Sequence, residues 1–479
     1  MLANQTDSPA GSSSRLGFAA ALGLCAIAAA VSLIPLGQET GNDANSWLVW
    51  AGQLAQGHSI NFSVGPSWKP LPVLLSLPFE FLSSQLAAHL WLWFVRFCLF
   101  ATSLLLFDLT RKEWGLLGGA VAALLPLAIG PWLTAGIAGM SEPVLIAASL
   151  AAITAGTSGR PRLALGFAIA AGLVRPEVWV FVLLWLTWRM LKDGEPLGTA
   201  AREGLGALSI WFVLWFVLPI SAGAKALQAS DRASEFMDLG ANGSAIFGVW
   251  LRVVPQKAWI LIPVGLLAGA VLRHQRRGRF ALLAAAAAAV WLVETLALNL
   301  AGVEPGISRF AIPAGIALCG LAGAGAGWLL ELVSSTGGQR GWLRAGAYLA
   351  VGFAIAWSLA SASTGTRSSW NNAIAFQASS DSQLAALQKA GGTNALGGCL
   401  PFATAGYPSH ARILSRRLNL PLQAVTAAPT DPTRGILLTS SDYAVRAIPQ
   451  LPTGPVLPLA KVGVWTVSYF GPSSGCSPR

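Results

Sequence analysis

The sequence predicts an α-helical polytopic membrane protein of about 11 transmembrane helices, with a small C-terminal α/β domain outside the cytoplasm. A helix that crosses a bilayer needs about 20 apolar residues. Three observations predict this class. Apolar segments of that length recur between residues 16 and 361. Charged residues make up only 11% of the chain, whereas soluble proteins carry roughly 25%. From residue 362 onward, the composition becomes that of a soluble domain.

The first apolar segment, Leu16–Leu36, follows a polar stretch. We expect residues 1–15 to form a disordered tail in the cytoplasm. The apolar segment is longer than the core of a secretory signal peptide, which has about 7–15 residues. It therefore predicts an uncleaved first helix.

The rest of the region 16–361 is expected to form helices near 85–109, 114–131, 141–156, 162–174, 178–191, 204–221, 258–272, 280–300, 309–332 and 342–361. Two of these, at 162–174 and 178–191, are too short to cross alone at about 1.5 Å per residue. They form either a short hairpin around Arg175-Pro176-Glu177 or two short helices that meet in a thinned or protein-lined region. The odd number of crossings places the two ends of the chain on opposite sides.

The net charge of +11 comes from clusters between the apolar segments. Lys and Arg are enriched in cytoplasmic loops, so these clusters predict a multi-pass protein of the cytoplasmic (inner) membrane with a cytoplasmic N-terminus. Residues 362–479 are then extracytoplasmic. No nucleic-acid partner is expected, because that would need a basic patch on a folded surface. The clusters are Arg111 and Lys112; Arg160 and Arg162; Arg189, Lys192 and Arg202; Arg273, Arg276, Arg277 and Arg279; and Arg340 and Arg344.

Three segments are expected on the outer side. The first outer loop, 37–84, begins with an amphipathic helix containing Trp47 and Trp50 and continues as a Pro-rich segment. The loop at 222–257 has the spacing of an interfacial helix. The short loop at 301–308 contains Glu304 and leads to Arg309.

The C-terminal domain is expected to combine helices at 382–390 and 410–418 with strands at 435–439 and 464–470. Its two cysteines are Cys399 and Cys476, whereas the other three cysteines lie in apolar segments. An oxidising compartment allows the two to pair, so a disulfide is predicted. The alternative is two unrelated thiols.

Carboxylates on the outer side are candidates for acid–base chemistry. Glu39 and Asp43 follow the first helix, and Glu142 opens a later one after Ser141. Each has a structural alternative. Asp43 suits a helix cap, Glu39 a solvated loop, and Glu142 the positive end of a helix dipole.

Cations on the same side are candidates for binding a phosphate. Lys69 is the one cation of the first outer loop, and it is flanked by Trp68 and Pro70. A lysine that extends to the membrane surface is the alternative for Lys69. The guanidinium groups of Arg175 and Arg309 suit phosphate, but they can instead pair with Glu177 and Glu304.

Motifs for several other functions are missing from the sequence. It contains no P-loop, dinucleotide fingerprint or nucleophile elbow, and no His/Cys/Asp spacing of a zinc site. An ATP-driven pump is therefore not favoured. A transporter or flippase is an alternative that predicts polar residues along a path through several helices. The helix interiors hold few such residues.

The order of motifs resembles the GT-C superfamily of membrane glycosyltransferases, in particular the bacterial branch related to family 39 and the lipopolysaccharide-core transferases. The resemblance covers about residues 16–361. It rests on the first-loop acid, Trp50-Ala51 with Leu54-Ala55-Gln56-Gly57, Lys69-Pro70-Leu71-Pro72, Ser141-Glu142-Pro143, Arg175-Pro176-Glu177, and Arg309 with Phe310 and Pro313.

This resemblance implies an inverting transfer of a sugar from a polyprenyl-phosphate carrier to a glycan, lipid or protein acceptor. Asp43 would be the general base, with Glu39 as its rival and Glu142 as the acid of the second outer loop. Many members carry an Asp-Glu pair where this chain has Asp43-Ala44. No cofactor is therefore certain, a divalent metal such as Mg²⁺ or Mn²⁺ stays open, and a non-catalytic relative that acts in envelope assembly is a further alternative. The implied substrate- and phosphate-binding residues are Lys69, Trp68, Arg175, Glu177, Arg309 and His58.

Overall fold

A computed structural model of the chain describes residues 10–62, 68–192, 196–221, 245–254, 258–273, 277–302, 306–335, 341–392, 402–404, 408–426, 435–441 and 455–471. Several predictions lie outside these residues. They are the disulfide between Cys399 and Cys476, the pairing of Glu304, most of the 222–257 loop, and most of the N-terminal tail.

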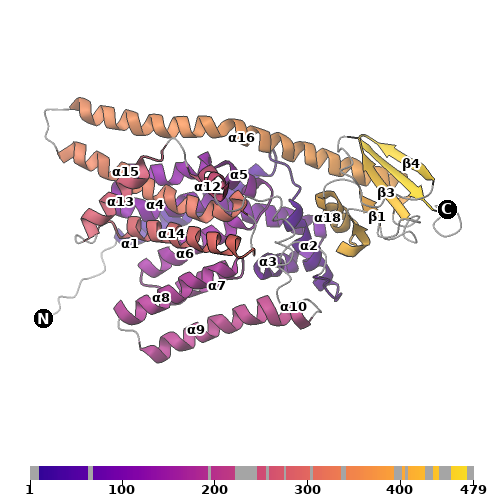
Figure 1. Cartoon of the computed structure of the whole chain (residues 1–479), viewed down its shortest axis with the longest axis horizontal. Helices are drawn as coiled ribbons and strands as arrows, with labels where there is room; N and C mark the ends of the chain where they lie inside the picture. Colours follow the sequence, from indigo (N-terminus) through magenta and orange to yellow (C-terminus); the bar gives the residue numbers. More distant parts are fainter. Residues whose placement is uncertain are drawn as a thin grey trace.

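Helices form most of the described chain, and they gather into a bundle (Figure 1). The N-terminal half contains α1 Ala10–Ser32, α2 Asn42–Ala55, α3 Pro70–Glu80, α4 Ser84–Leu124, η1 Leu125–Ala128, α5 Gly130–Ile137, α6 Glu142–Thr157, α7 Pro161–Gly172, η2 Pro176–Val178 and α8 Trp179–Lys192. The second half contains α9 Leu197–Phe212, η3 Val213–Val217, α10 Leu218–Ser221, α12 Ala245–Trp250, η5 Leu251–Val253, α13 Leu261–Leu272, α14 Arg279–Leu300, α15 Ser308–Ser335 and α16 Gly341–Lys389.

The bundle is that of a multi-pass membrane protein. Among the described residues, four helices are long and apolar enough to cross a bilayer: Ser84–Ala128, Leu197–Ser221, Arg279–Leu300 and Ser308–Ser335. A fifth span results if α5 and α6, bent by 106° to each other, form one broken crossing. Shorter apolar helices cover Leu16–Ser32, Pro161–Gly172, Leu261–Leu272 and Tyr348–Ser361. The predicted count of 11 is therefore only partly confirmed, because several of the expected crossings are short or broken.

The helices predicted at 85–109 and 114–131 join at Gly115, where φ is 72° and ψ is −177°. A side chain other than glycine is strained at a positive φ. A Cβ atom built on Gly119 would lie 2.9 Å from the Phe107 carbonyl oxygen. Since twelve residues of straight helix rise about 18 Å, this contact between residues 107 and 119 means that the chain folds back at Gly115.

The centre of the bundle is α15, whose glycines allow very close helix packing. A Cβ atom on Gly323 would lie only 2.5 Å from the Gly118 carbonyl oxygen in α4. Gly315, Gly325 and Gly327 meet backbone of neighbouring elements in the same way. Small residues let helix backbones approach in membranes, where apolar burial drives association weakly.

One helix continues without interruption across the domain boundary predicted at residue 362. Helix α16 continues from Gly341 to Lys389 and extends from the bundle to the sheet (Figure 1). Its final turns contain the helix predicted at 382–390, and Ala386 and Leu387 belong to the core of the soluble domain. The transmembrane and soluble regions are thus joined by one helix.

The soluble domain is a five-stranded sheet in the order β2-β1-β3-β5-β4. Its elements are β1 Phe402–Thr404, α18 Pro408–Arg417, η8 Leu422–Ala424, β2 Val425–Thr426, β3 Gly435–Ser440, β4 Val456–Val462 and β5 Trp465–Phe470. β1 pairs in parallel with β2 and β3, whereas β5 pairs antiparallel with β3 and β4. The predicted α18, β3 and β5 are confirmed, and β1, β2 and β4 were not predicted. Figure 1 shows α2, α3 and α18 between the bundle and the sheet.

Candidate active site

The starts of several helices bring charged side chains together at the end of the bundle next to α18. Asp43 is the second residue of α2 and Lys69 directly precedes α3. Glu142 is the first residue of α6, and Arg309 is the second residue of α15. Arg175 precedes η2. Helix N-termini carry partial positive charge, so this end of the bundle favours an anion. We call Asp43, Lys69, Glu142, Arg175, Glu177 and Arg309 the charged cluster.

Asp43 is buried and paired with a cation. Its Oδ2 accepts a hydrogen bond from Arg309 Nη1 at 2.7 Å, and its Oδ1 accepts one from Asn42 Nδ2 at 3.2 Å. Burial opposes ionisation of this carboxyl group, but the charges of Arg309 and Lys69 and the hydrogen bond from Arg309 outweigh it, so the pKa of Asp43 is lowered. Asp43 is therefore an ionised carboxylate, and its basicity is held down by Arg309.

Lys69, the one cation of the first outer loop, is buried. Its Nζ donates to Ser141 Oγ at 2.6 Å and lies 5.2 Å from the centroid of the Trp47 ring. The pKa of Lys69 is lowered to about 8, chiefly by burial and also by the charges of Arg175 and Arg309, while Glu142 and Asp43 act in the opposite direction. Its charge is therefore sensitive to the local balance of anions.

Arg175 joins the two glutamates of the charged cluster. Its Nη1 lies 2.8 Å from Glu177 Oε1 and its Nη2 lies 3.9 Å from Glu142 Oε1. Its guanidinium carbon stands 4.2 Å from the centroid of the Phe310 ring, and that of Arg309 stands 5.2 Å from the same ring. The guanidinium groups of both arginines thus lie near the same aromatic ring, that of Phe310.

Glu142 is 1% exposed, and neither of its carboxylate oxygens has a hydrogen-bond partner within the described residues. A buried carboxylate without such partners is costly. Glu142 does stand at the helix start, as its structural alternative predicted. Among the described residues, the positive charges of Arg175 and Lys69 act on this carboxylate.

Three of the predicted site residues lie outside the charged cluster. Glu39 pairs with Arg416 and Arg417 of α18. Trp68 donates from Nε1 to the Leu214 carbonyl oxygen at 2.9 Å and packs against the rings of Trp50 and Phe62. His58 is exposed at the rim of a separate pocket.

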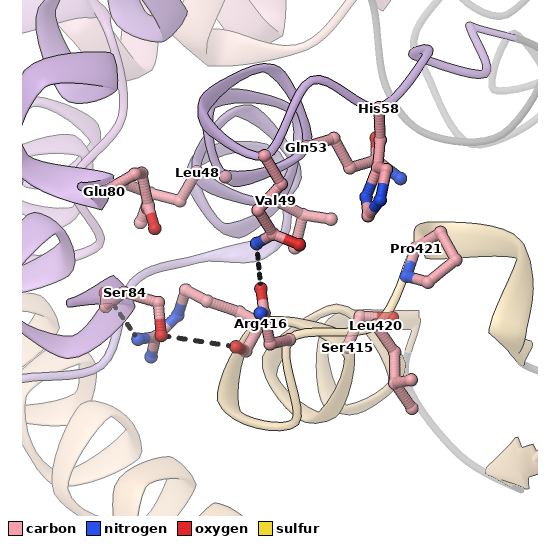
Figure 2. Close-up of a pocket in the computed structure, with 13 residues that line it drawn as sticks. Leu48, Val49, Gln53, His58, Glu80, Ser84, Ser415, Arg416, Leu420 and Pro421 are labelled. Atoms are coloured by element: carbon pink, nitrogen blue, oxygen red, sulfur yellow. Dashed lines mark hydrogen bonds between the residues drawn. The ribbon is translucent and has the colours of Figure 1, made fainter. Parts of the chain in front are cut away.

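That pocket lies between α2 and α18, and Figure 2 shows its lining. It is a cavity of about 50 Å³. Gln56 Nε2 donates to Asn419 Oδ1 at 2.6 Å, and Arg416 Nη1 donates to the Ser84 carbonyl oxygen at 3.3 Å. Glu80 also lines it, and burial raises the pKa of Glu80 to about 7 in spite of the nearby Arg416 charge. The pocket therefore marks a polar contact between the membrane and soluble regions.

Some residues of the site carry no signal in the sequence. Ser141 makes no capping hydrogen bond at the start of α6 and accepts a hydrogen bond from Lys69 instead. Arg416 lies beside Asn45, although 371 residues separate them in the chain. In the sequence, the feature at this contact is the Arg416-Arg417 pair at the end of the helix predicted at 410–418. The described residues hold no group of three or more His, Cys, Asp or Glu side chains that could bind a metal ion.

The fold defines a class of structure: the chain has a GT-C-like polytopic membrane fold, which it shares with solved structures. Two solved structures that it resembles are those of ArnT from Cupriavidus metallidurans. The ArnT structure bound to undecaprenyl phosphate has a TM-score of 0.55 at 12% identity, over 97% of this chain and 99% of that one. The apo structure has a TM-score of 0.55 at 15% identity, over 97% and 100%.

A third solved structure, the oligosaccharyltransferase of Archaeoglobus fulgidus tethered to an acceptor peptide, aligns with a TM-score of 0.48 at 12% identity, over 86% of this chain and 64% of that one. No protein-family model matches the sequence, and no curated protein matches it significantly. At these identities the two ArnT comparisons establish the fold alone.

Proposed function

We propose that this protein is a glycosyltransferase that moves a sugar from a polyprenyl-phosphate carrier to an extracytoplasmic acceptor with inversion at the anomeric carbon. One observation carries the proposal: the buried carboxylate of Asp43 stands among Lys69, Arg175 and Arg309, at a point where helix N-termini meet. A sugar joined to a phosphate needs both kinds of group, a base for the incoming hydroxyl and cations for the departing phosphate. The ArnT structure with bound undecaprenyl phosphate supports a lipid phosphate as the anion.

The donor phosphate competes with Asp43 for Arg309. Arg309 is the most accessible of the three cations, since 29% of its side chain is exposed. When the phosphate takes hydrogen bonds from Arg309, the Asp43 carboxylate loses the partner that lowers its pKa. Donor binding therefore raises the basicity of Asp43 at the moment when a base is needed.

In the transfer step, Asp43 removes the proton of an acceptor hydroxyl. The acceptor oxygen forms a bond to the anomeric carbon from the face opposite the phosphate, and the bond from this carbon to the phosphate oxygen breaks. The lipid phosphate leaves with the bonding electron pair. Lys69 and Arg175 stabilise the added negative charge, because preorganised cations act strongly at a site with little water.

A transporter or flippase is less favoured by the contacts of the buried charges. Arg96 in α4 donates to the carbonyl oxygens of Ser32, Gly37 and Ile137. Asp108 pairs with Arg111 and Lys112 on the same helix. Arg96 thus connects α4 to other segments and Asp108 is paired within α4, so both charges have protein partners.

The first prediction concerns Asp43. Replacement Asp43→Asn removes the base and keeps the shape, so transfer should fall about 10²–10⁴-fold while undecaprenyl phosphate still binds. Purified protein in lipid nanodiscs is supplied with polyprenyl-phosphate-linked glucose, mannose, galactose, N-acetylglucosamine and arabinose in turn. Membranes of a strain that lacks the protein provide the acceptor.

Glu203→Gln is the matched control, because Glu203 is a carboxylate that pairs with Arg189 between α8 and α9. It should transfer sugar at the normal rate. Full turnover by Asp43→Asn removes Asp43 from the role of base. Absence of transfer by the unaltered protein with every donor, together with normal binding of undecaprenyl phosphate, favours the non-catalytic relative.

A further inference from the structure

Helix α18 of the soluble domain ends in two arginines that contact the first outer loop. Arg416 Nη2 lies 2.8 Å from Glu39 Oε2, and Arg417 binds Glu39 Oε1. Arg417 also pairs with Asp381 of α16 at 2.6 Å. The side chains of Arg416 and Glu39 are 2% and 4% exposed. A buried ion pair gives little net stability by itself, so stability alone does not explain the contact between these arginines and Glu39.

Arg416 differs from Arg417 in its further partners. Its Nε donates to Asn45 Oδ1 at 2.8 Å, and its Nη1 donates to the Ser84 carbonyl oxygen at 3.3 Å. One guanidinium thus binds the loop before α2, helix α2 itself and the start of α4. Because the guanidinium is planar and rigid, these three segments are held in a fixed relation.

Hydrogen bonds of Asn45 connect Arg416 with the start of α2. Its Nδ2 donates to the carbonyl oxygens of Thr40 at 2.5 Å and Gly41 at 3.1 Å. The Gly41 amide donates to the Ala138 carbonyl oxygen at 2.7 Å. The orientation of the Asn45 amide follows from its surroundings, since a guanidinium meets its oxygen and carbonyl groups meet its nitrogen. The turn that begins α2 is therefore tied to the soluble domain.

The helix geometry connects this contact with Asp43. Asn45 follows Asp43 by two positions, and at 3.6 residues per turn their side chains point about 200° apart around α2. Asn45 faces α18, while Asp43 faces Arg309 on the other side. A rotation of α2 about its axis would move the Asp43 carboxylate away from the charged cluster, and the contact on the opposite face opposes that rotation.

We propose that Arg416 of the soluble domain is a positioning residue for Asp43, acting through Asn45 and Glu39 to fix the rotation of α2. This inference rests on the function proposed above and assigns a task to the soluble domain, which supplies the positioning group. Glu39 thereby receives a role distinct from that of a base. Arg416 does not touch the substrate in this arrangement.

The test compares Arg416→Gln, Arg416→Lys and Asn45→Ala with Arg417→Gln in full-length protein in nanodiscs. Arg417→Gln is the matched control, because it removes the bonds of Arg417 to Glu39 Oε1 and Asp381 and leaves the bond between Arg416 and Asn45 in place. Hydrogen exchange of the backbone amides from Gly41 to Asn45, measured by mass spectrometry, reports how often the start of α2 opens, and it needs no substrate. It should rise at least about tenfold in Arg416→Gln and Asn45→Ala, less in Arg416→Lys, and stay unchanged in Arg417→Gln.

Sugar transfer gives the second readout. Arg416→Gln should lower kcat on the order of 10–100-fold, because small misplacements of a reacting group are costly, with little change in the KM for the donor. Asn45→Ala should do the same, and the double variant should be no slower than either single one, because both break one connection. The acid limb of the pH profile of kcat/KM, which reports the enzyme without bound donor, should move to higher pH, since a displaced Asp43 loses the charge of Arg309 that lowers its pKa.

Equal effects of Arg416→Gln and Arg417→Gln would show a general docking contact and overturn the proposal. So would a loss of kcat in Arg416→Gln with an unmoved acid limb and unchanged exchange, or additive effects in the double variant. Asp43→Asn separates the two proposals. If that variant transfers sugar normally, the proposed function fails. If it is inactive while Arg416→Gln is normal, only the positioning role fails.

Discussion

At the scale of residues, the site is built from charges that are already paired before any substrate arrives. Arg309 holds Asp43, Ser141 holds Lys69, and Glu177 holds Arg175. Side chains fixed in this way lose little conformational freedom on binding. A donor phosphate then exchanges partners within an ordered network, and this exchange controls the basicity of Asp43.

Lys69 makes this network dependent on pH. Its pKa of about 8 means that the ammonium is charged below that pH and neutral above it. Affinity for undecaprenyl phosphate should therefore fall as the pH rises from 7 to 9, by up to about tenfold if one ionic hydrogen bond is lost. The measurement is a titration with undecaprenyl phosphate in nanodiscs.

Two variants of Lys69 control for other titrating groups. Lys69→Gln should bind undecaprenyl phosphate weakly at every pH, and its affinity should not change near pH 8. Lys69→Arg should bind undecaprenyl phosphate equally at pH 7 and pH 9, because its guanidinium stays charged. A step that persists in Lys69→Gln assigns the pH dependence to another residue.

The sequence located much of the charged cluster, because Asp43, Lys69, Glu142, Arg175 and Arg309 all stand at helix starts on the expected outer side. It did not separate Glu39 from Asp43. Glu39 lies four positions before Asp43, and only the contact with α18 reveals its different environment. Local sequence carries no information about a partner that lies more than 370 residues away.

At the scale of elements, helix α15 sets how closely the bundle packs. Gly323 and Gly118 leave no space for a side chain at the contact of α15 with α4. Arg309 stands at the start of the same helix. Close packing of α15 therefore also fixes the position of a group that holds Asp43.

Gly323→Ala should destabilise the protein, because the added methyl group would meet the Gly118 carbonyl oxygen at 2.5 Å. Overpacking of this kind costs about 1–3 kcal/mol. Gly346→Ala in α16 is the control, since no atom lies within 4 Å of the added group there. Thermal unfolding in detergent should show a lower Tm for Gly323→Ala and an unchanged or slightly higher Tm for Gly346→Ala. Equal Tm values would mean that the contact adapts.

Apolar periodicity located the helices well, but it did not show how they join. The turn at Gly115 and the bend between α5 and α6 depend on backbone geometry that the apolar pattern does not encode. The continuation of α16 beyond residue 361 was missed because its composition turns polar where it leaves the bundle. Strand β4 was missed because it contains Pro458 and is largely exposed. Edge strands commonly have these features.

At the scale of the whole molecule, the proposed function requires the charged cluster and the soluble domain to lie on the outer side of the membrane. The cluster is next to α18, and the basic clusters predicted to be cytoplasmic include Arg277, which bonds with Glu113 and Glu331. The positive-inside rule places such groups in the cytoplasm. The orientation is therefore a prediction that can be tested separately from catalysis.

Alkaline phosphatase fused after Phe470 should be active, and green fluorescent protein fused there should be dark, because the first folds only outside the cytoplasm and the second fluoresces only inside it. The same reporters inserted after Lys192, between α8 and α9, should give the reverse result and serve as the control. A fluorescent fusion after Phe470 would place the charged cluster in the cytoplasm and exclude an extracytoplasmic acceptor.

The unbroken course of α16 has a mechanical consequence. Its 49 residues extend for about 73 Å at 1.5 Å per residue, more than twice the roughly 30 Å of a bilayer interior. A rod without a flexible joint carries its two ends together, so a tilt imposed by lipid thickness also turns the sheet and the arginines docked against it. Sugar transfer by this protein would then respond to the acyl-chain length of the surrounding lipids.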